Sequence, residues 1–249
     1  MSNWVSAAFI ALATAAPASD PPKSTTPLGS DARIPVLIVS GSDRFHDWRR
    51  TTPQLRSMLE ATGRFDVRVV EDVAALESRA VTDRYRTIIL NGQADRSMPG
   101  LRRNLTRYVH RGGGLVAIHW AIDNFHDWPG FSNLLGRSWQ EGVSAEEHGA
   151  FEIAPTPLQN PITTNLVPWT TPAGEAVHYR LKGRAPISIL ATTHTALGGD
   201  QIPVAFIHMA GRGRAFFTPL GHSFATRADP NFQILIARAV EWSATGTVR

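Results

Sequence analysis

Four short runs of apolar, largely β-branched residues mark the first half of the chain, and they restrict its fold more than any other feature. The runs occupy residues 34–40, 65–70, 85–90 and 115–119. Runs of this length and composition are typical of strands that are buried on both faces of a parallel sheet. Helical patterns at 51–62 and 99–110 supply crossover connections between them. The sequence therefore predicts a doubly wound α/β domain with a mostly parallel sheet and helices on both faces.

The second half of the chain is less regular. Residues 124–172 are rich in proline and aromatic residues, a composition that favours long loops packed over one end of the sheet. Strand patterns return at 176–181, 187–193, 204–209 and 213–219, and an amphipathic helix follows at about 230–242. We therefore expect a single domain, residues 34–244, whose second half is an irregular, loop-rich β region.

The N-terminal residues have the pattern of an export signal. An apolar stretch at residues 5–16 is followed by Ala16-Pro17-Ala18, a small-x-small cleavage site. The stretch is shorter than the roughly 20 residues that a membrane-spanning helix needs. We expect residues 1–18 to be a cleaved signal peptide, residues 19–33 a linker, and the mature protein to be periplasmic or secreted, without integral membrane association. Because no Lys or Arg precedes the apolar stretch, an ordinary disordered N-terminus is the alternative.

The composition excludes several kinds of chemistry. The 249 residues include no Cys, which excludes disulfides, Cys-ligated zinc or iron–sulfur sites, and a Cys nucleophile. The chain also lacks the Gly-x-Ser-x-Gly motif of serine hydrolases. The formal net charge is only +4, and the arginines are scattered along the sequence. This distribution argues against a nucleic-acid partner, which normally requires basic residues gathered on one face.

Histidines follow three of the predicted strands. In an open α/β sheet, ligands bind beyond the carboxyl ends of the strands, and the strand pattern places His46, His119 and His222 at that edge. Trp48 and Trp120 lie in the same loops. Tryptophan faces stack on sugar rings, and His, Asp, Asn and Gln side chains hydrogen-bond to sugar hydroxyls. The pattern therefore favours a small carbohydrate ligand.

Several segments together resemble the trehalose-utilisation, or ThuA-like, family. They are Phe45-His46-Asp47-Trp48, GGGLVAIH at 112–119, Gly136 with His148 downstream, Glu175 with Tyr179, and GRAFFTPLGH at 213–222. The resemblance extends over about residues 34–243. It implies a doubly wound, flavodoxin-like sheet of the class I glutamine amidotransferase type. It also implies a role in the catabolism of trehalose and related sugars, often through 3-keto-glycoside intermediates.

The chain departs from the family pattern at two places. Relatives usually carry His-Pro-Ile where this chain has Asn160-Pro161-Ile162, so any role of that histidine is absent here. The acidic pair that precedes the family's Tyr is reduced to Gly174-Glu175, which leaves one carboxylate. His119 stands where the amidotransferase fold places its nucleophile. An imidazole at this position must serve as an acid or base, as a hydroxyl-binding group or as a metal ligand.

The candidate site residues fall into two groups. The candidates for catalysis are His119, Glu175, His46 and His222, with Glu175 supported by the resemblance alone. The candidates for substrate binding are Trp48, Trp120, Asp123 and His148. Histidine and carboxylate ligands suit zinc or another divalent ion. No His-x-x-x-His or His-Glu-x-x-His motif localises such a metal in the sequence.

Two classes of function remain open. In the first, the protein is a periplasmic hydrolase, lyase or isomerase that acts on a disaccharide or glycoside derivative, such as a 3-keto-glycoside, by His/Glu acid–base or metal-assisted chemistry. In the second, it is a non-catalytic carbohydrate-binding or accessory protein with the same pocket. An ordinary two-carboxylate glycosidase fits poorly, because only Glu175 is supported as a site carboxylate. If His119 is catalytic, His119→Ala should abolish turnover with little change in melting temperature, whereas loss of a core histidine should cost about 1–3 kcal/mol of stability.

Overall fold

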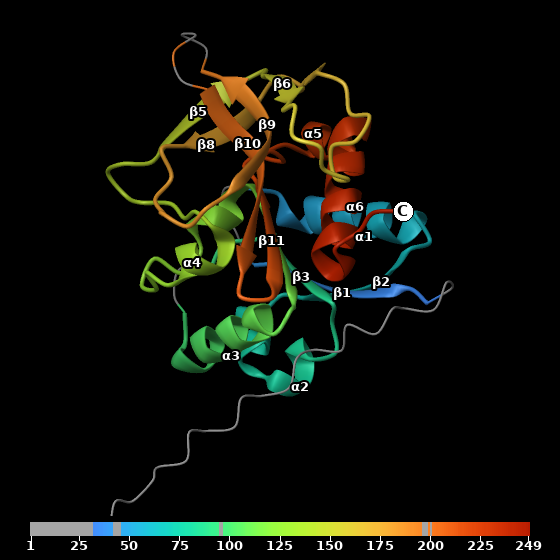
Figure 1. Cartoon of the computed structure of the whole chain (residues 1–249), viewed down its shortest axis with the longest axis vertical. Coiled ribbons are helices and arrows are strands. Elements are labelled where there is room, and N and C mark those ends of the chain that lie inside the picture. Colours follow the sequence, from blue (N-terminus) through green and yellow to red (C-terminus); the bar gives the residue numbers. More distant parts are fainter. Residues whose placement is uncertain (1–31, 42–45, 95–96, 196–198, 200) are drawn as a thin grey trace, which may run out of the picture.

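A nine-stranded mixed sheet forms the centre of the protein (Figure 1). The computed structural model describes residues 32–41, 46–94, 97–195, 199 and 201–249. The predicted signal peptide, residues 1–18, and nearly all of the predicted linker, residues 19–33, lie outside the described residues. In spatial order the strands are β2 (Phe65–Val70), β1 (Ile34–Val39), β3 (Thr87–Leu90), β4 (Gly114–Ile118), β11 (Gly213–Thr218), β10 (Gln201–Ala210), β9 (Ser188–His194), β6 (Glu152–Pro155) and β7 (Trp169–Thr170).

The first five strands in this order are parallel, and the other four continue the sheet in antiparallel pairs. The four strands predicted from the first half of the sequence are β1, β2, β3 and β4. Every residue of β3 and β4 is buried, because both faces of the sheet are covered there. The predicted doubly wound α/β fold with a parallel core is therefore confirmed.

Helices cover both faces of the parallel strands, as predicted. α1 (Trp48–Ala61) and α6 (Pro230–Thr245) share one hydrophobic core with Ile89, and α3 (Pro99–His110) and α4 (Phe131–Leu135) share the other with Ile88. Successive residues of a strand point to opposite faces, which is why these two neighbours enter different cores. Figure 1 places α1 and α6 on one side of the sheet and α4 on the other.

The ends of two helices differ from the predicted ones. α1 begins at Trp48, three residues before the predicted start, and α6 continues three residues beyond its predicted end. α6 stops at Gly246, whose φ of 85° is the left-handed geometry that ends many helices. Four short helical turns complete the description: η1 (Val73–Glu77), α2 (Arg79–Thr82), η2 (His119–Asp123) and α5 (Phe224–Ala228). Among the described residues, no helix has the length and apolar character that crossing a bilayer requires.

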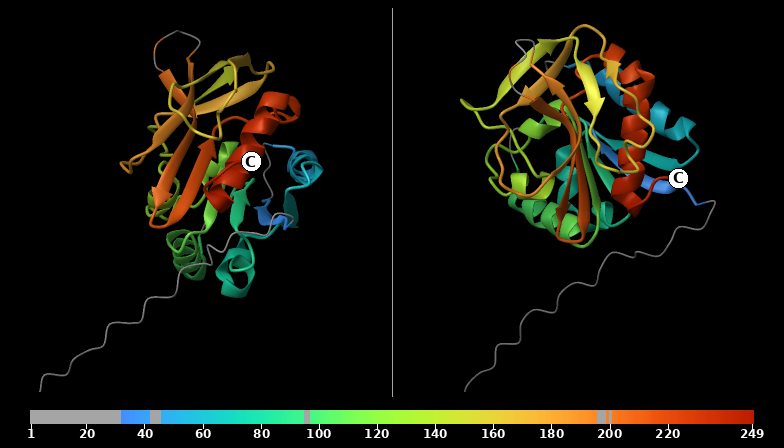
Figure 2. Two further views of the ribbon diagram at one scale, coloured as in Figure 1. Left: turned by 45° about the vertical axis from the view of Figure 1, so that its right-hand side comes forward. Right: turned by 45° about the horizontal axis from the view of Figure 1, so that its top comes forward.

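Residues 124–172 are more ordered than the predicted long loops. They contain α4, β6, β7 and β5 (Ala145–Gly149), and β5 pairs with β8 (Glu175–Tyr179) in a separate two-stranded antiparallel sheet. Figure 2 shows these yellow strands gathered with the orange ones at the end of the molecule away from α3. The prediction missed β5 because its sequence, AEEHG, is poor in residues with high β-propensity. Pairing with β8 supplies the order that the local sequence does not.

Candidate functional site

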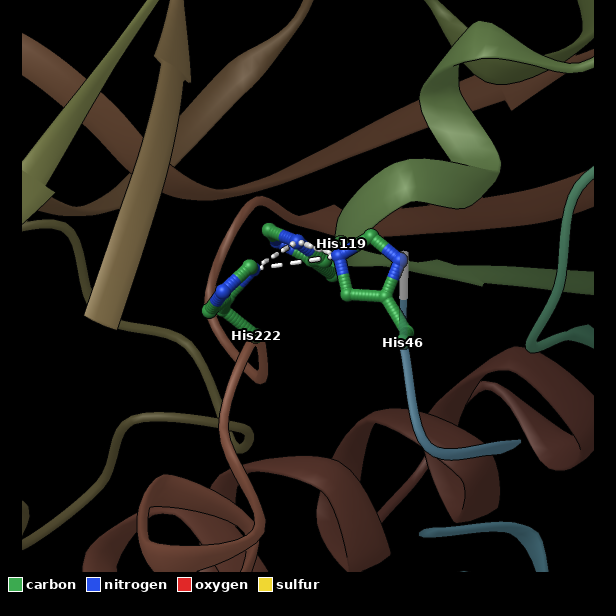
Figure 3. Close-up of side chains that lie close together, drawn as sticks. All are labelled: His46, His119 and His222. Carbon is green, nitrogen blue, oxygen red and sulfur yellow. Dashed lines mark hydrogen bonds between the residues drawn. The ribbon is translucent and has the colours of Figure 1, made fainter. Parts of the chain in front are cut away.

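Three histidines meet at the carboxyl edge of the parallel strands (Figure 3). His119 directly follows β4, His222 follows β11, and His46 lies between β1 and α1. His119 Nε2 is 2.9 Å from His46 Nε2 and 3.0 Å from His222 Nδ1, and the last two atoms are 3.1 Å apart. We call these three side chains the histidine triad. The strand-end rule used on the sequence selected all three, and the structure brings them together.

Two glycines allow the first strand to contribute to this cluster. β3 lies between β1 and β4 in the sheet, so β1 can contribute to a site at the end of β4 only if the residues that directly follow β1 and β3 pack closely together. A Cβ on Gly41 would lie 2.6 Å from the carbonyl oxygen of Gln93, and a Cβ on Gly92 would overlap the backbone nitrogen of Gly41. Both positions therefore require glycine, because any side chain would push the two backbones apart.

His119 is held in one tautomer. Its side chain is 1% exposed, and Nδ1 lies 2.6 Å from the carbonyl oxygen of Pro219. A carbonyl can only accept a hydrogen bond, so Nδ1 carries the hydrogen and Nε2 presents a lone pair to His46 and His222. Burial, followed by the neighbouring His178 and His46, holds the pKa of His119 well below its usual value. The ring is therefore neutral at pH 7.

Glu175 lies behind the turn that carries His222. It is fully buried on β8, and its carboxylate accepts hydrogen bonds from the backbone N–H groups of Gly221 at 3.2 Å and His222 at 2.9 Å. Gly221 has a φ of 102°, which only glycine adopts easily. Burial raises the pKa of Glu175. Glu175, a candidate for catalysis, thus positions His222 through the backbone in this geometry.

Arg227 holds the same turn from the other side. Its guanidinium donates from Nε to the carbonyl oxygen of Gly221 at 2.7 Å and from Nη1 to Asn91 Oδ1 at 2.6 Å.

Burial, followed by the charges of His46 and His148, lowers the pKa of His222 to about 4. His222, like His119, is therefore neutral at pH 7.

The three facing nitrogens cannot satisfy one another by hydrogen bonding alone. In a neutral imidazole each nitrogen is either a donor or an acceptor. Of three such atoms at least two must be alike, which leaves two lone pairs or two N–H groups facing each other at about 3 Å. A cation at the centre removes the conflict. Nitrogens bound about 2.05 Å from zinc lie roughly 2.9 Å apart at right angles and roughly 3.3 Å apart at tetrahedral angles. The triad's separations of 2.9–3.1 Å fall in this range.

A second group of ionisable side chains borders the triad from the β5–β8 sheet. Glu146 and His178 are register partners in that sheet, and His178 Nε2 lies 3.4 Å from Glu146 Oε1. His148 Nε2 lies 3.5 Å from the same oxygen. The ring of His178 stacks on His119 with centroids 4.6 Å apart, and the His148 ring is 5.3 Å from that of His222. We call these three side chains the β5–β8 group.

The β5–β8 group was only partly visible in the sequence. His148 was a candidate, but Glu146 and His178 were missed, because their proximity depends on the register of two short strands. Alternation is the one signal that could have found Glu146, since residues 146 and 148 share a face if 145–149 is a strand. The hydrogen bond from His178 lowers the pKa of Glu146, so the carboxylate is charged at pH 7. Burial lowers the pKa of His178, and Glu146 opposes that shift.

Of the other candidates, Trp120 joins the site and Trp48 does not. The Trp120 ring lies 6.1 Å from His46 and 4.9 Å from His178, and its buried indole N–H has no acceptor within the described part of the chain. Trp48 is the first residue of α1 and lies on the β2 side, where it lines a cavity of about 430 Å³ with Arg49 and Val69. Of the two candidate tryptophans, Trp120 therefore borders the triad, and Trp48 lines a different cavity.

Asp123 and Asn160 have local partners. Asp123 ends the turn η2, accepts a hydrogen bond from Gln93 Nε2 at 3.1 Å and lies 3.3 Å from His126 Nδ1. Asp123 therefore lines a neighbouring cavity and not the triad. Asn160, which replaces the family's histidine, accepts from the backbone N–H of Ile162 at 3.0 Å and so stabilises its own turn.

The fold and the residues at its edge define a class: a doubly wound α/β domain with three histidines at the carboxyl edge of its parallel strands. The family profile ThuA, described as trehalose utilisation, matches residues 35–243. The chain therefore belongs to the ThuA family. A search of curated proteins gave no match.

Solved structures agree with this assignment. A ThuA-like protein from Parabacteroides merdae is 25% identical with a TM-score of 0.77, and the match covers 87% of this chain and 92% of that one. A ThuA-like protein from Bacteroides uniformis is 16% identical with a TM-score of 0.69, covering 89% and 97%. The fold also resembles part of the β-galactosidase from Rahnella sp. R3, at 18% identity and a TM-score of 0.57, covering 86% of this chain but 32% of that one.

Proposed function

We propose that this protein is a metal-dependent enzyme of the periplasm that acts on a disaccharide or glycoside derivative, such as a 3-keto-glycoside. The observation that carries the proposal is the histidine triad. Two of its rings are neutral at pH 7, one tautomer is fixed by Pro219, and the three facing nitrogens are 2.9–3.1 Å apart. A divalent ion such as zinc is the ligand that suits three such nitrogens. Membership of the trehalose-utilisation family supports the choice of substrate class.

Each group of the site has a distinct chemical task in this proposal. His46, His119 and His222 would hold the ion, which would act as a Lewis acid towards a sugar carbonyl or hydroxyl oxygen. His178, paired with Glu146, gives and takes the proton, because the neighbouring carboxylate stabilises the imidazolium that forms when the ring accepts a proton. The Trp120 ring, which contacts His46 and His178, forms an apolar wall. Glu175 and Arg227 keep His222 in place.

Metal content and turnover test the proposal together. We expect the purified protein to hold one zinc ion per chain, as measured by elemental mass spectrometry. We also expect turnover of 3-keto-trehalose, which EDTA abolishes and added zinc restores. Turnover that persists in EDTA would contradict the metal role. Binding of trehalose or its 3-keto derivative without any turnover would support the alternative, a carbohydrate-binding or accessory protein.

Variants of two adjacent glutamates, Glu146 and Glu147, distinguish a role in acid–base catalysis from a role in metal binding. Glu146→Gln should lower kcat by roughly 100-fold or more, because general acid–base groups typically contribute that much, while zinc content stays unchanged. Glu147→Gln is the matched control, since successive residues of β5 point to opposite faces and Glu147 therefore points away from Glu146. Equal activity of the two variants would remove the β5–β8 group from the mechanism.

The periplasmic location is proposed from the sequence of the first 18 residues. We expect protein purified from its native envelope to begin near Ser19, because cleavage follows Ala16-Pro17-Ala18. Mass spectrometry of the intact protein measures this directly. An N-terminus at Met1 would contradict export by this route.

A further inference from the structure

A cavity beside the histidine triad has no role in the chemistry described so far. Its volume is about 250 Å³, and its walls include two tryptophans, Trp128 and Trp139. Asp123 and Glu141 provide hydrogen-bond acceptors, and Lys182 provides donors. Aromatic faces combined with polar groups of both kinds are what a sugar ring requires, because its ring face is apolar and its edge carries hydroxyls.

The cavity and the triad are neighbours, linked by contacting aromatic rings. The Trp139 ring lies 5.6 Å from Trp120 and 5.6 Å from His178, and both of these rings contact His119. The turn η2 connects the two places along the chain, since it begins at His119 and ends at Asp123.

Backbone strain marks both ends of this connection. His119 has a φ of 51° and Phe125, which lines the cavity, a φ of 61°. A non-glycine residue in the left-handed region is strained, and such residues concentrate at functional sites. Residues 119–125 are therefore strained at both points where they contribute a side chain, His119 to the triad and Phe125 to the cavity.

The cavity walls are held in place by the protein itself. The Trp139 backbone N–H donates to the carbonyl oxygen of Ile122 at 3.1 Å, and its indole N–H donates to Glu141 at 3.3 Å. Ser138 and Lys182 exchange two backbone hydrogen bonds of 2.8 Å. Gly130 leaves room for Trp128, because a Cβ there would lie 2.5 Å from its indole nitrogen. A site whose walls are fixed before binding loses less entropy when it binds.

We infer that this cavity is a second sugar subsite, which holds the ring of the disaccharide that does not reach the triad; the inference rests on the proposed carbohydrate function. The volume is below the roughly 300–1,000 Å³ of sites for larger organic ligands, so it suits one ring. Two carboxylates face one lysine in its walls, which favours an uncharged hexose over a sugar phosphate or uronic acid.

Calorimetric titration with trehalose and with methyl α-glucoside tests the inference. The proteins to compare are zinc-loaded wild type, Trp128→Ala, Lys182→Met and Arg56→Met. Wild type should bind trehalose more tightly than the monosaccharide. Trp128→Ala should weaken trehalose binding by about 3- to 10-fold, the factor expected for a lost aromatic stacking contact, and should reduce the preference for trehalose over methyl α-glucoside. Lys182→Met should act in the same direction. Lys182 is exposed, so the fold tolerates its replacement.

Arg56→Met is the matched control, because it removes a surface cation on α1, on the side of the cavity that Trp48 lines. It should bind both sugars as wild type does. Unchanged trehalose binding in both cavity variants, or equal weakening of both sugars, would overturn the second subsite while leaving the proposed function intact. Wild-type protein that takes up zinc but binds neither sugar would overturn the carbohydrate function and the subsite with it.

Discussion

His119 is at once a core residue and a site residue. Its ring is buried, its Nδ1–H donates to Pro219, and its Nε2 faces the triad. The expectation that a catalytic His119 could be removed at little cost in stability does not suit this geometry, because the carbonyl of Pro219 would lose its partner. A buried acceptor left unpaired costs about 1–3 kcal/mol.

We therefore predict two losses for His119→Ala. Zinc affinity should fall by about 100-fold or more, since even indirect partners of a metal site contribute 10- to 100-fold, and the free energy of unfolding should fall by about 1–3 kcal/mol. His208→Ala is the control, because His208 is also buried with both nitrogens at backbone carbonyls. His208→Ala should lower the free energy of unfolding and leave the zinc affinity unchanged. Wild-type zinc affinity in His119→Ala would refute the triad as a metal site.

The low pKa of His222, about 4, predicts how the stability of the metal-free protein depends on pH. Between the unfolded pKa of about 6.5 and the folded value, the unfolded chain binds a proton that the native chain does not. Stability should therefore fall as the pH decreases from about 6.5 to 4. His119 acts in the same direction, and the charge of Glu146 opposes the shift of His222. Urea unfolding of His222→Gln should show a weaker dependence in this range; an identical one would contradict the prediction.

A site residue could be predicted from the sequence when its position depended on the end of a single strand. It could not be predicted when its position depended on how two strands pair. His46, His119 and His222 each follow a predicted strand, so the edge rule sufficed for them. Glu146 and His178 meet only through the pairing of β5 with β8. Trp48 was misplaced because α1 begins at that residue, earlier than its periodicity indicated.

At the scale of elements, the close packing of the residues that follow β1 and β3 helps to bring His46 to the triad. The sheet order separates β1 from β4, and beyond the strand ends Gly41 contacts Gly92 and Gln93. The strands themselves were predictable from their continuous apolar runs. This glycine contact was not, because it joins residues that are about 50 positions apart in sequence.

Gly92→Ala should therefore separate His46 from the other two histidines. We expect zinc affinity to fall by about 10- to 100-fold, the range seen when ligands lose their positioning, with all three ligands still present. Gly199→Ala is the control, since the nearest atom to its new Cβ would be 3.7 Å away. Calorimetric titration with zinc measures both. Equal affinities would mean that the contact between Gly41 and Gly92 can relax without moving His46.

On the scale of the whole molecule, one sheet joins two differently built halves. The parallel half was predictable because βαβ connections leave both apolar runs and helical periods in the sequence. The antiparallel half, β10 with β9, β6 and β7, contributes no residue to the triad. Next to it, the β5–β8 sheet brings the second group against the triad.

Zinc should stabilise this whole arrangement. At a free concentration about 100 times Kd, a ligand that binds only the native state adds about 2.7 kcal/mol. For a chain of this size that corresponds to a rise in Tm of roughly 5–10 °C. Scanning calorimetry of the zinc-loaded and EDTA-treated protein measures the shift. The variant with all three triad histidines replaced by Gln should show none, and a shift that survives in it would place the ion elsewhere.

The sequence separations within the triad have a consequence for how the chain comes apart. His46 and His119 are 73 residues apart, and His119 and His222 are 103 apart. An ion bound to all three would tie the ends of two long loops together in a chain that contains no Cys. It would serve as a removable cross-link, with the entropic benefit that long loops give to disulfides. The rate of refolding would then be limited by the assembly of β1, β4 and β11. Removal of the ion by a chelator would lower the stability of the fold, as reduction of a disulfide does.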